Sequence, residues 1–173
     1  DCVFSGRKGG YTEADLPDPE DLYGRTKLLG EVEGVHSLTL RTSLVGRELR
    51  GAKGLLEWFL SQRGQVSGFR RAVFSGLTTY AFTQMIRSVI EDCPAFEGIY
   101  HVSSEPISKY HLLCRLKEAL GLATDVVPDD AVVVNRSLNS TRFWNVTGLK
   151  APGWDEMIAE LARIVTAYAA WRF

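Results

Sequence analysis

Hydrophobic residues recur at helical spacing in three stretches of the chain, and each stretch begins beside residues that favour a helix start. Thr78 or Thr79 can open the first helix, whose apolar face carries Phe82, Met85, Ile86, Val89 and Ile90. Ser108 can open the second and Gly121 can close it, with its core face made of Leu112, Leu113, Leu116 and Leu120. Pro152 and Gly153 precede the third, whose stripe is Trp154, Met157, Ile158, Leu161, Val165 and Tyr168.

Shorter apolar runs between these helices predict β-strands. Residues 37–41 alternate in polarity as a half-buried strand does. Further strands are predicted at residues 73–74, 98–102 and 132–134, the end of a strand at residues 2–4, and a helix at residues 55–62. Strands that alternate with helices indicate an α/β domain, in which helices flank a parallel sheet and ligands gather at the carboxyl ends of the strands.

An additional helix is predicted near the start of the chain. Asp18 can cap it with Pro19 at its first position, and Gly34 marks its end. Its apolar stripe runs through Leu22, Leu29 and Val32, while Tyr23 and Lys27 share an adjacent face one turn apart.

Composition and charge narrow the function classes. The formal net charge is −1, from 20 basic and 21 acidic residues spread along the chain, which argues against nucleic acid and anionic membranes as partners. No apolar run approaches the roughly 20 residues needed to cross a bilayer. Three cysteines without metal-ligand spacing favour reduced thiols and a cytoplasmic location, and the three histidines, in unrelated contexts, favour structural roles.

The Tyr23 and Lys27 pair is the strongest candidate for chemistry. A tyrosine is a poor acid or base at neutral pH, but a lysine ammonium one helical turn away favours the phenolate and makes the pair a usable proton donor. The same ammonium has donors for ribose hydroxyls, which suits a nicotinamide nucleotide beside a carbonyl. The bare spacing arises by chance roughly a quarter of the time in a chain with six tyrosines, so the surroundings decide.

Those surroundings resemble the extended short-chain dehydrogenase/reductases, most closely the dTDP-4-dehydrorhamnose reductase family. The matching stretches are DCVFSG, YTEADLPDPEDLYGRTKLLGE, LRTSLVG, FSGLTTYAFTQMI, GIYHVSSEPISKYHLL and NRSLNSTRF, in the order that the family has them. The resemblance implies the C-terminal part of a Rossmann-type fold. Residues 1–46 would be the catalytic-helix end of the sheet, and residues 47–173 mostly the substrate-binding part.

The resemblance also implies roles for individual residues. Tyr23 would be the catalytic acid, and Lys27 would tune it and hold the ribose of NADP or NAD. Tyr23 and Ser43 would also contact this cofactor. A nucleotide-sugar substrate would be contacted by Asp1, Cys2 and Val45. Apart from the resemblance, the chemistry of Arg136 would suit the diphosphate of such a substrate, which a guanidinium holds by paired hydrogen bonds, and an exposed loop arginine is the equal alternative.

Part of the family pattern has no counterpart in this sequence. The Ser or Thr that completes the triad would stand immediately before Asp1, and no glycine-rich dinucleotide motif opens a βαβ unit; residues 5–10 are expected to form a turn. We therefore expect a fragment of a reductase of 4-keto sugar nucleotides, inactive by itself, with a homodimer left open. Two alternatives remain: a non-catalytic regulatory or binding subunit with the same fold, and a sugar-nucleotide epimerase or dehydratase.

Overall fold

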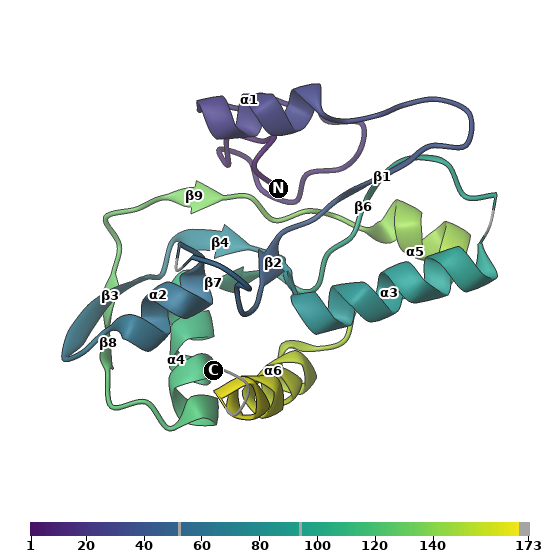
Figure 1. Cartoon of the computed structure of the whole chain (residues 1–173). Coiled ribbons are helices and arrows are strands. Elements are labelled where there is room, and N and C mark those ends of the chain that lie inside the picture. Colours follow the sequence, from purple (N-terminus) through teal and green to yellow (C-terminus); the bar gives the residue numbers. More distant parts are fainter. Residues whose placement is uncertain (52, 94, 170–173) are drawn as a thin grey trace.

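The structure, a computed structural model, describes residues 1–51, 53–93 and 95–169, without the side chains of residues 168 and 169. The elements follow one another as α1 (Leu22–Leu29), β1 (Leu38–Arg41), β2 (Leu44–Val45), α2 (Leu55–Ser61), β3 (Gln65–Phe69), β4 (Ala72–Phe74), β5 (Leu77–Thr78), α3 (Thr79–Asp92), β6 (Gly98–His101), β7 (Ile107–Ser108), α4 (Lys109–Leu120), β8 (Asp125–Asp129), β9 (Val134–Asn135), α5 (Thr141–Thr147) and α6 (Trp154–Ala169). Strands and helices alternate through most of the chain, so the α/β class is confirmed (Figure 1).

The strands form four small sheets, and parallel pairing dominates them. β1 pairs with β6, β2 with β5, and β3 with β8, all in parallel. β4 pairs in parallel with β9 but antiparallel with β7, an exception that the sequence pattern did not predict. In the first pair Leu38 stands opposite Gly98 and Arg41 opposite His101, so the carboxyl ends of β1 and β6 lie together.

One large hydrophobic core packs helices α3, α4 and α6 against these strands. It buries Met85 and Val89 of α3, together with Leu112, Leu113 and Leu116 of α4 and Met157, Ile158 and Leu161 of α6. The predicted faces of α4 and α6 are thereby confirmed for the described side chains; Tyr168 lies outside them. In α3 the prediction for Ile90 was wrong, since this side chain is 69% exposed.

The predicted helix caps are confirmed for α3 and α4. The Thr78 side chain accepts a hydrogen bond from the backbone N–H of Ala81, and that of Ser108 from the N–H of His111. Gly121 ends α4 in the left-handed conformation, with φ of 62°, which glycine adopts without steric cost. None of the helices in the described ranges is both long and apolar enough to cross a membrane.

The first helix differs from its prediction in both boundaries. Asp21, not Asp18, is its N-cap, and it ends at Gly30 rather than Gly34. The Asp18 carboxylate instead accepts the backbone N–H of Ser5 at 2.8 Å and its hydroxyl at 2.6 Å, which lowers the pKa of Asp18. Asp18 therefore fixes the preceding loop, which leaves Asp21 to cap the helix.

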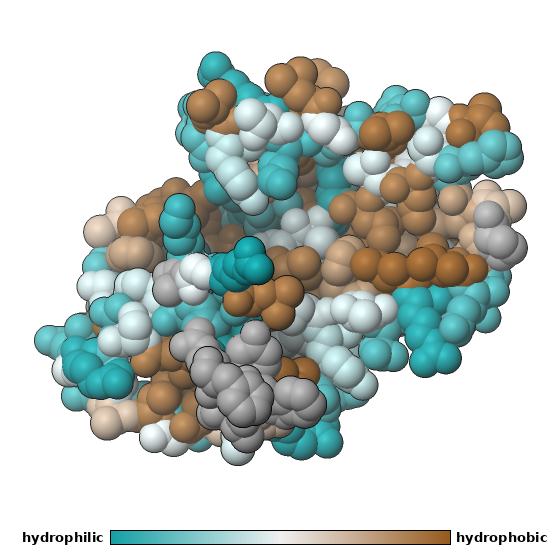
Figure 2. Space-filling model, in the orientation of Figure 1, coloured by the Kyte–Doolittle hydropathy of each residue, from teal (hydrophilic) through white to brown (hydrophobic). Residues whose placement is uncertain are grey.

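Helix α1 buries little apolar surface, and its half-buried Leu28 packs against a small cluster near the start of the chain. Its predicted apolar stripe is exposed: Leu22 is 77% exposed, Leu29 86% and the following Val32 56%. The only buried residue of α1 is Gly24. Figure 1 shows the helix at the top, apart from the other helices, and Figure 2 shows hydrophobic side chains on the surface in that region.

Residues 2–4 form a turn instead of the predicted strand end. The backbone N–H of Phe4 donates to the carbonyl of Asp1 at 3.0 Å, which closes the turn and leaves no extended ladder. Val3 and Phe4 are buried in a second, smaller cluster with Tyr11 and Leu138. The predicted turn at residues 5–10 is confirmed, and both Gly6 and Lys8 donate their backbone N–H to the Tyr11 hydroxyl at 3.1 Å.

A buried histidine joins this small cluster to the strands. His101 Nδ1 lies 2.9 Å from the Tyr11 carbonyl oxygen, and Nε2 lies 3.3 Å from Nη1 of Arg41. Because a guanidinium can only donate, Nε2 accepts and the proton sits on Nδ1, so the ring is neutral. Burial lowers the pKa of His101, and the Arg41 charge adds to this effect while the Glu13 carboxylate opposes it.

We expect Gly24→Ala to displace α1. A Cβ at this position would stand 2.3 Å from the Cys2 carbonyl oxygen and 2.8 Å from Cβ of Pro19, closer than atoms approach without a shift. Chemical denaturation should show a loss of about 1–3 kcal/mol. Gly30→Ala is the matched control, because its nearest contacts would be ordinary ones at 3.5 and 3.6 Å. Equal stability of both variants would contradict this account of how α1 is seated.

We expect His101→Asn to make the free energy of unfolding less dependent on pH in the acid range. A histidine whose pKa is lowered on folding takes up its proton on unfolding, so stability is lost as pH falls below about 6.5, the unfolded value. Asparagine keeps a donor for the Tyr11 carbonyl and does not titrate.

Between pH 7 and 5.5 the wild type should therefore lose more stability than His101→Asn, measured by denaturant unfolding. His36→Asn is the control, because this exposed histidine has a φ of 63° that asparagine tolerates. Identical pH slopes for the wild type and His101→Asn would rule out the buried neutral ring.

Candidate functional site

Helix α1 presents the candidate pair on its surface. The Asp21 carboxylate accepts the N–H of Gly24 at 2.6 Å, which fixes the first turn, and one turn separates Tyr23 from Lys27. The Lys27 ammonium lies 5.4 Å from the centroid of the Tyr23 ring, within the range of a cation–π contact. Tyr23 is 62% exposed, so both groups are accessible to a ligand.

Four of the predicted site residues line one pocket of about 240 Å³. Asp1, Cys2, Tyr23 and Lys27 meet there with residues of β1 and of the segment after it, among them Thr42. The backbone nitrogen of Asp1 donates to the Thr42 carbonyl at 2.8 Å, so the first residues lie against the carboxyl end of β1. This is the sheet edge at which the sequence predicted ligands to gather.

The other predicted residues line an adjoining pocket of about 250 Å³. Ser43, Val45 and Arg136 come together in it, and Asp1 lines both pockets. Ser43 therefore lies with Arg136 and not in the pocket of Tyr23 and Lys27. All seven residues are thus placed in two neighbouring hollows, although they come from three distant parts of the chain.

Arg136 has the chemistry of an anion-binding group. Its backbone N–H donates to the Val73 carbonyl at 2.9 Å, which fixes its position beside β4. Its Nε atom is buried and, among the described residues, has no hydrogen-bond partner. A buried donor without a partner costs free energy, and a ligand oxygen in the pocket would satisfy it.

Sequence reasoning missed three further charged residues of these pockets. Lys109 lines the pocket of Arg136, because it follows the cap of α4 at the point where β4 meets β7. Glu31 and Arg41 line the pocket of Tyr23, as a buried ion pair with both N–O distances at 2.7 Å. For Glu31 the sequence did offer a signal, because it stands four residues after Lys27, on the same side of a helix.

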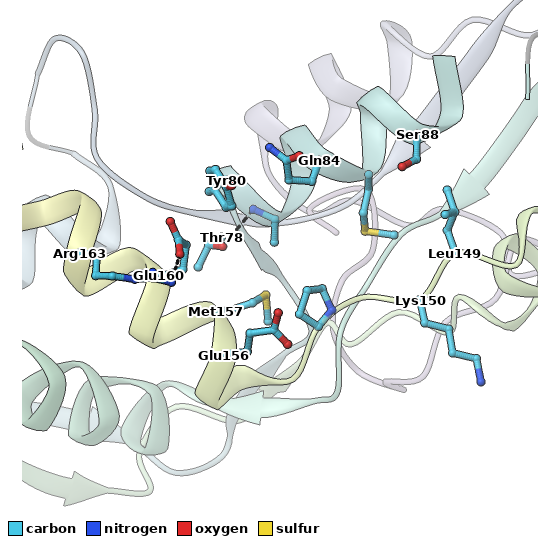
Figure 3. Close-up of a pocket in the computed structure, with 13 residues that line it drawn as sticks. Thr78, Tyr80, Gln84, Ser88, Leu149, Lys150, Glu156, Met157, Glu160 and Arg163 are labelled. Carbon is cyan, nitrogen blue, oxygen red and sulfur yellow. Dashed lines mark hydrogen bonds and ion pairs between the residues drawn. The ribbon is translucent and has the colours of Figure 1, made fainter. Parts of the chain in front are cut away.

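Other hollows contain none of the predicted site residues. One of about 320 Å³ lies between α3 and α6, where Tyr80 and Gln84 face Met157 and Glu160 (Figure 3). Another of about 540 Å³ is lined by Ser103, Ser140 and Trp144, but the two serine hydroxyls bond to each other at 2.7 Å. Within the described ranges no three His, Cys, Asp or Glu side chains gather as metal ligands.

The loop of residues 5–10 is poorly suited to bind the pyrophosphate of a dinucleotide. Two of its backbone N–H groups are already bonded to the Tyr11 hydroxyl. Lys27 fits the other end of such a cofactor: in the part of the chain that the structure describes, its ammonium has no ion-pair partner and keeps its donors for a ligand.

Comparison with known proteins shows the family and the fold of the chain. Residues 1–166 match the sequence model of the family described as the RmlD substrate binding domain. A dTDP-4-dehydrorhamnose reductase from Bacillus anthracis, solved in complex with NADP, superposes with a TM-score of 0.75 at 23% identity, over 92% of this chain and 61% of that one. A hypothetical dTDP-4-dehydrorhamnose reductase from Sulfolobus tokodaii gives 0.69 at 30% identity, over 87% and 56%.

A curated relative comes from a different functional class. Methionine adenosyltransferase 2 subunit beta of Xenopus tropicalis is 27% identical over 143 residues, which are 70% of this chain and 40% of that protein. The chain thus spans about two-fifths of the length of this relative. Because the family match extends over 166 of the 173 residues and the fold agrees, the chain belongs to the RmlD substrate-binding-domain family of the extended short-chain dehydrogenase/reductases.

Proposed function

We propose that this chain supplies the proton-donating pair and the nucleotide-sugar pocket of an NAD(P)H-dependent reductase of 4-keto sugar nucleotides. The observation that carries the proposal is the pairing of the two pockets. One holds Tyr23 with Lys27, whose ammonium has no ion-pair partner among the described residues, and the next holds the buried Nε of Arg136, which has no hydrogen-bond partner among them. One nucleotide-sugar ligand could span both pockets, with its carbonyl beside the first and its diphosphate in the second.

Each side chain then has a distinct task. When bound, NADPH or NADH supplies the hydride for the carbonyl carbon. Tyr23 donates its phenolic proton to the carbonyl oxygen, and Lys27 favours the phenolate that remains while its other donors hold ribose hydroxyls. Asp1, Cys2 and Val45 contact the sugar, and Ser43, predicted for the cofactor, lies on the side of Arg136.

A second candidate is a non-catalytic regulatory subunit that binds a nucleotide and does not turn it over. The observation that favours it is the 27% identity to methionine adenosyltransferase 2 subunit beta. Both candidates use the same two pockets, so binding alone does not separate them. Turnover does, together with its dependence on Tyr23. For an epimerase or dehydratase we find no specific support in the pockets.

We expect Tyr23→Phe in the full-length protein to lower turnover of a 4-keto sugar nucleotide by roughly 10²- to 10⁴-fold, with cofactor affinity nearly unchanged. Phenylalanine keeps the exposed ring but has no proton to give. Steady-state kinetics and a cofactor titration measure the two effects separately. Lys27→Met should lower turnover and cofactor affinity together, because it removes both the charge and the ribose contact.

Tyr80→Phe is the matched control, because Tyr80 is also an exposed helical tyrosine but lines the hollow between α3 and α6. Its turnover should equal that of the wild type. A Tyr23→Phe rate within threefold of the wild type would show that the proton comes from elsewhere. Nucleotide binding without any turnover in the wild type would favour the regulatory candidate.

We expect Arg136→Met to raise KM for the nucleotide sugar about 10- to 100-fold and to change kcat little, because the diphosphate is bound alike in the ground and transition states. The melting temperature should stay nearly constant, since the buried Nε has no partner to lose among the described residues. Arg70→Met is the control, because Arg70 pairs with Asp130 on the surface. An unchanged KM would remove Arg136 from the substrate site.

A further inference from the structure

Lys27 has a carboxylate within reach that it does not use. Glu31 stands four residues after Lys27, the spacing at which oppositely charged side chains pair on a helix surface. The backbone N–H of Glu31 donates to the Leu28 carbonyl at 3.1 Å, which continues the turn of α1 past its last residue. Both side chains line the same pocket of about 240 Å³. A Lys27–Glu31 pair would be the local expectation.

Instead, Arg41 of β1 binds both carboxylate oxygens of Glu31. Its Nε and Nη2 atoms each lie 2.7 Å from a different carboxylate oxygen, a two-point contact that only a guanidinium makes. The Arg41 side chain is 8% exposed and that of Glu31 11%, so water screens the pair little. Nη1 reaches His101, and the guanidinium carbon lies 5.4 Å from the Phe4 ring centroid, which fixes the arginine from two more sides.

Helix α1 itself does not favour a carboxylate at this place. Its C-terminal end carries the negative end of the helix dipole, which attracts Lys27 in the last turn and repels Glu31 just beyond it. Without Arg41, the Glu31 carboxylate would be open to the Lys27 ammonium, which lines the same pocket.

We propose that Arg41 is a positioning residue, which takes both oxygens of Glu31 and so keeps the Lys27 ammonium free for Tyr23 and for a ligand. The inference rests on the proposed function in one respect: that function is the reason why Lys27 must stay free. The sequestration itself is a property of the side chains and can be measured without turnover.

The test compares acylation of Lys27 in the wild type, Arg41→Met, Glu31→Gln and the double variant, by mass spectrometry of the full-length protein with Lys53 as internal reference. Acylating reagents attack the neutral amine, and a neighbouring carboxylate stabilises the ammonium. Arg41→Met should therefore lower Lys27 labelling about twofold to fivefold, and Arg41→Met/Glu31→Gln should restore it. Simple loosening of α1 would raise the labelling instead.

Arg47→Met is the matched control, because it removes the similarly buried Arg47–Glu57 ion pair, whose N–O distance is 2.8 Å, without touching α1. If Arg41→Met does not fold, Arg41→Gln serves by the same criterion, since a neutral amide does not compensate the charge of the carboxylate. Labelling that is unchanged or raised in the arginine variant would overturn the proposal.

The two hypotheses fail separately. If labelling falls and recovers while Tyr23→Phe leaves the rate intact, the sequestration stands and the proposed chemistry of Tyr23 is wrong. If Tyr23→Phe is inactive but Arg41→Met leaves the labelling of Lys27 unchanged, the proposed reductase function is supported and the positioning role of Arg41 is wrong.

Discussion

The buried ion pair between Glu31 and Arg41 is the contact on which the candidate site depends. Helix α1 fully buries only Gly24 and packs the half-buried Leu28 against the small cluster, so the hydrophobic effect contributes little to holding it against the rest of the chain. The ion pair joins the end of this helix to the last residue of β1, opposite His101 of β6. Removal of Arg41 would take from the buried Glu31 carboxylate its two-point partner, and changes that leave a buried charge less well paired are among the more costly in a protein.

The same contact explains how distant parts of the chain reach one site. Arg41 is the last residue of β1, and Thr42 and Ser43 follow it directly into the two pockets. A parallel pair of strands brings its carboxyl ends to one edge, and the turn at residues 1–4 packs against that edge. β4 and β9 bring Arg136 to the other side of Asp1. Short strands and local hydrogen bonds, more than a large core, thus shape the site.

The sequence predicted well the helices that bury apolar surface, and less well the boundaries of α1, the helix that carries the candidate pair Tyr23 and Lys27. The capped amphipathic helices α3 and α4 begin at Thr78 and Ser108 as expected, because local capping and core burial agree there. For α1, two aspartates competed for the cap, and a tertiary contact decided: Ser5 binds Asp18. Apart from Arg136, the residues of the site were predicted from the family resemblance. The contact between Glu31 and Arg41 needed the structure, since nothing local shows that residues ten apart would meet.

A helix held by polar contacts sets different conditions for the two candidate functions. A regulatory subunit needs Lys27 only as a donor to a bound nucleotide, and a shift of α1 by a fraction of an ångström would change its affinity modestly. A reductase needs the Tyr23 oxygen at hydrogen-bonding distance from a carbonyl oxygen, a requirement that small displacements violate. A two-point contact such as Glu31–Arg41 fixes direction as well as distance, which a single lysine contact would not. The two-point contact at this end of α1 therefore suits the closer positioning that the proposed reductase would need, whereas nucleotide binding alone would need less of it.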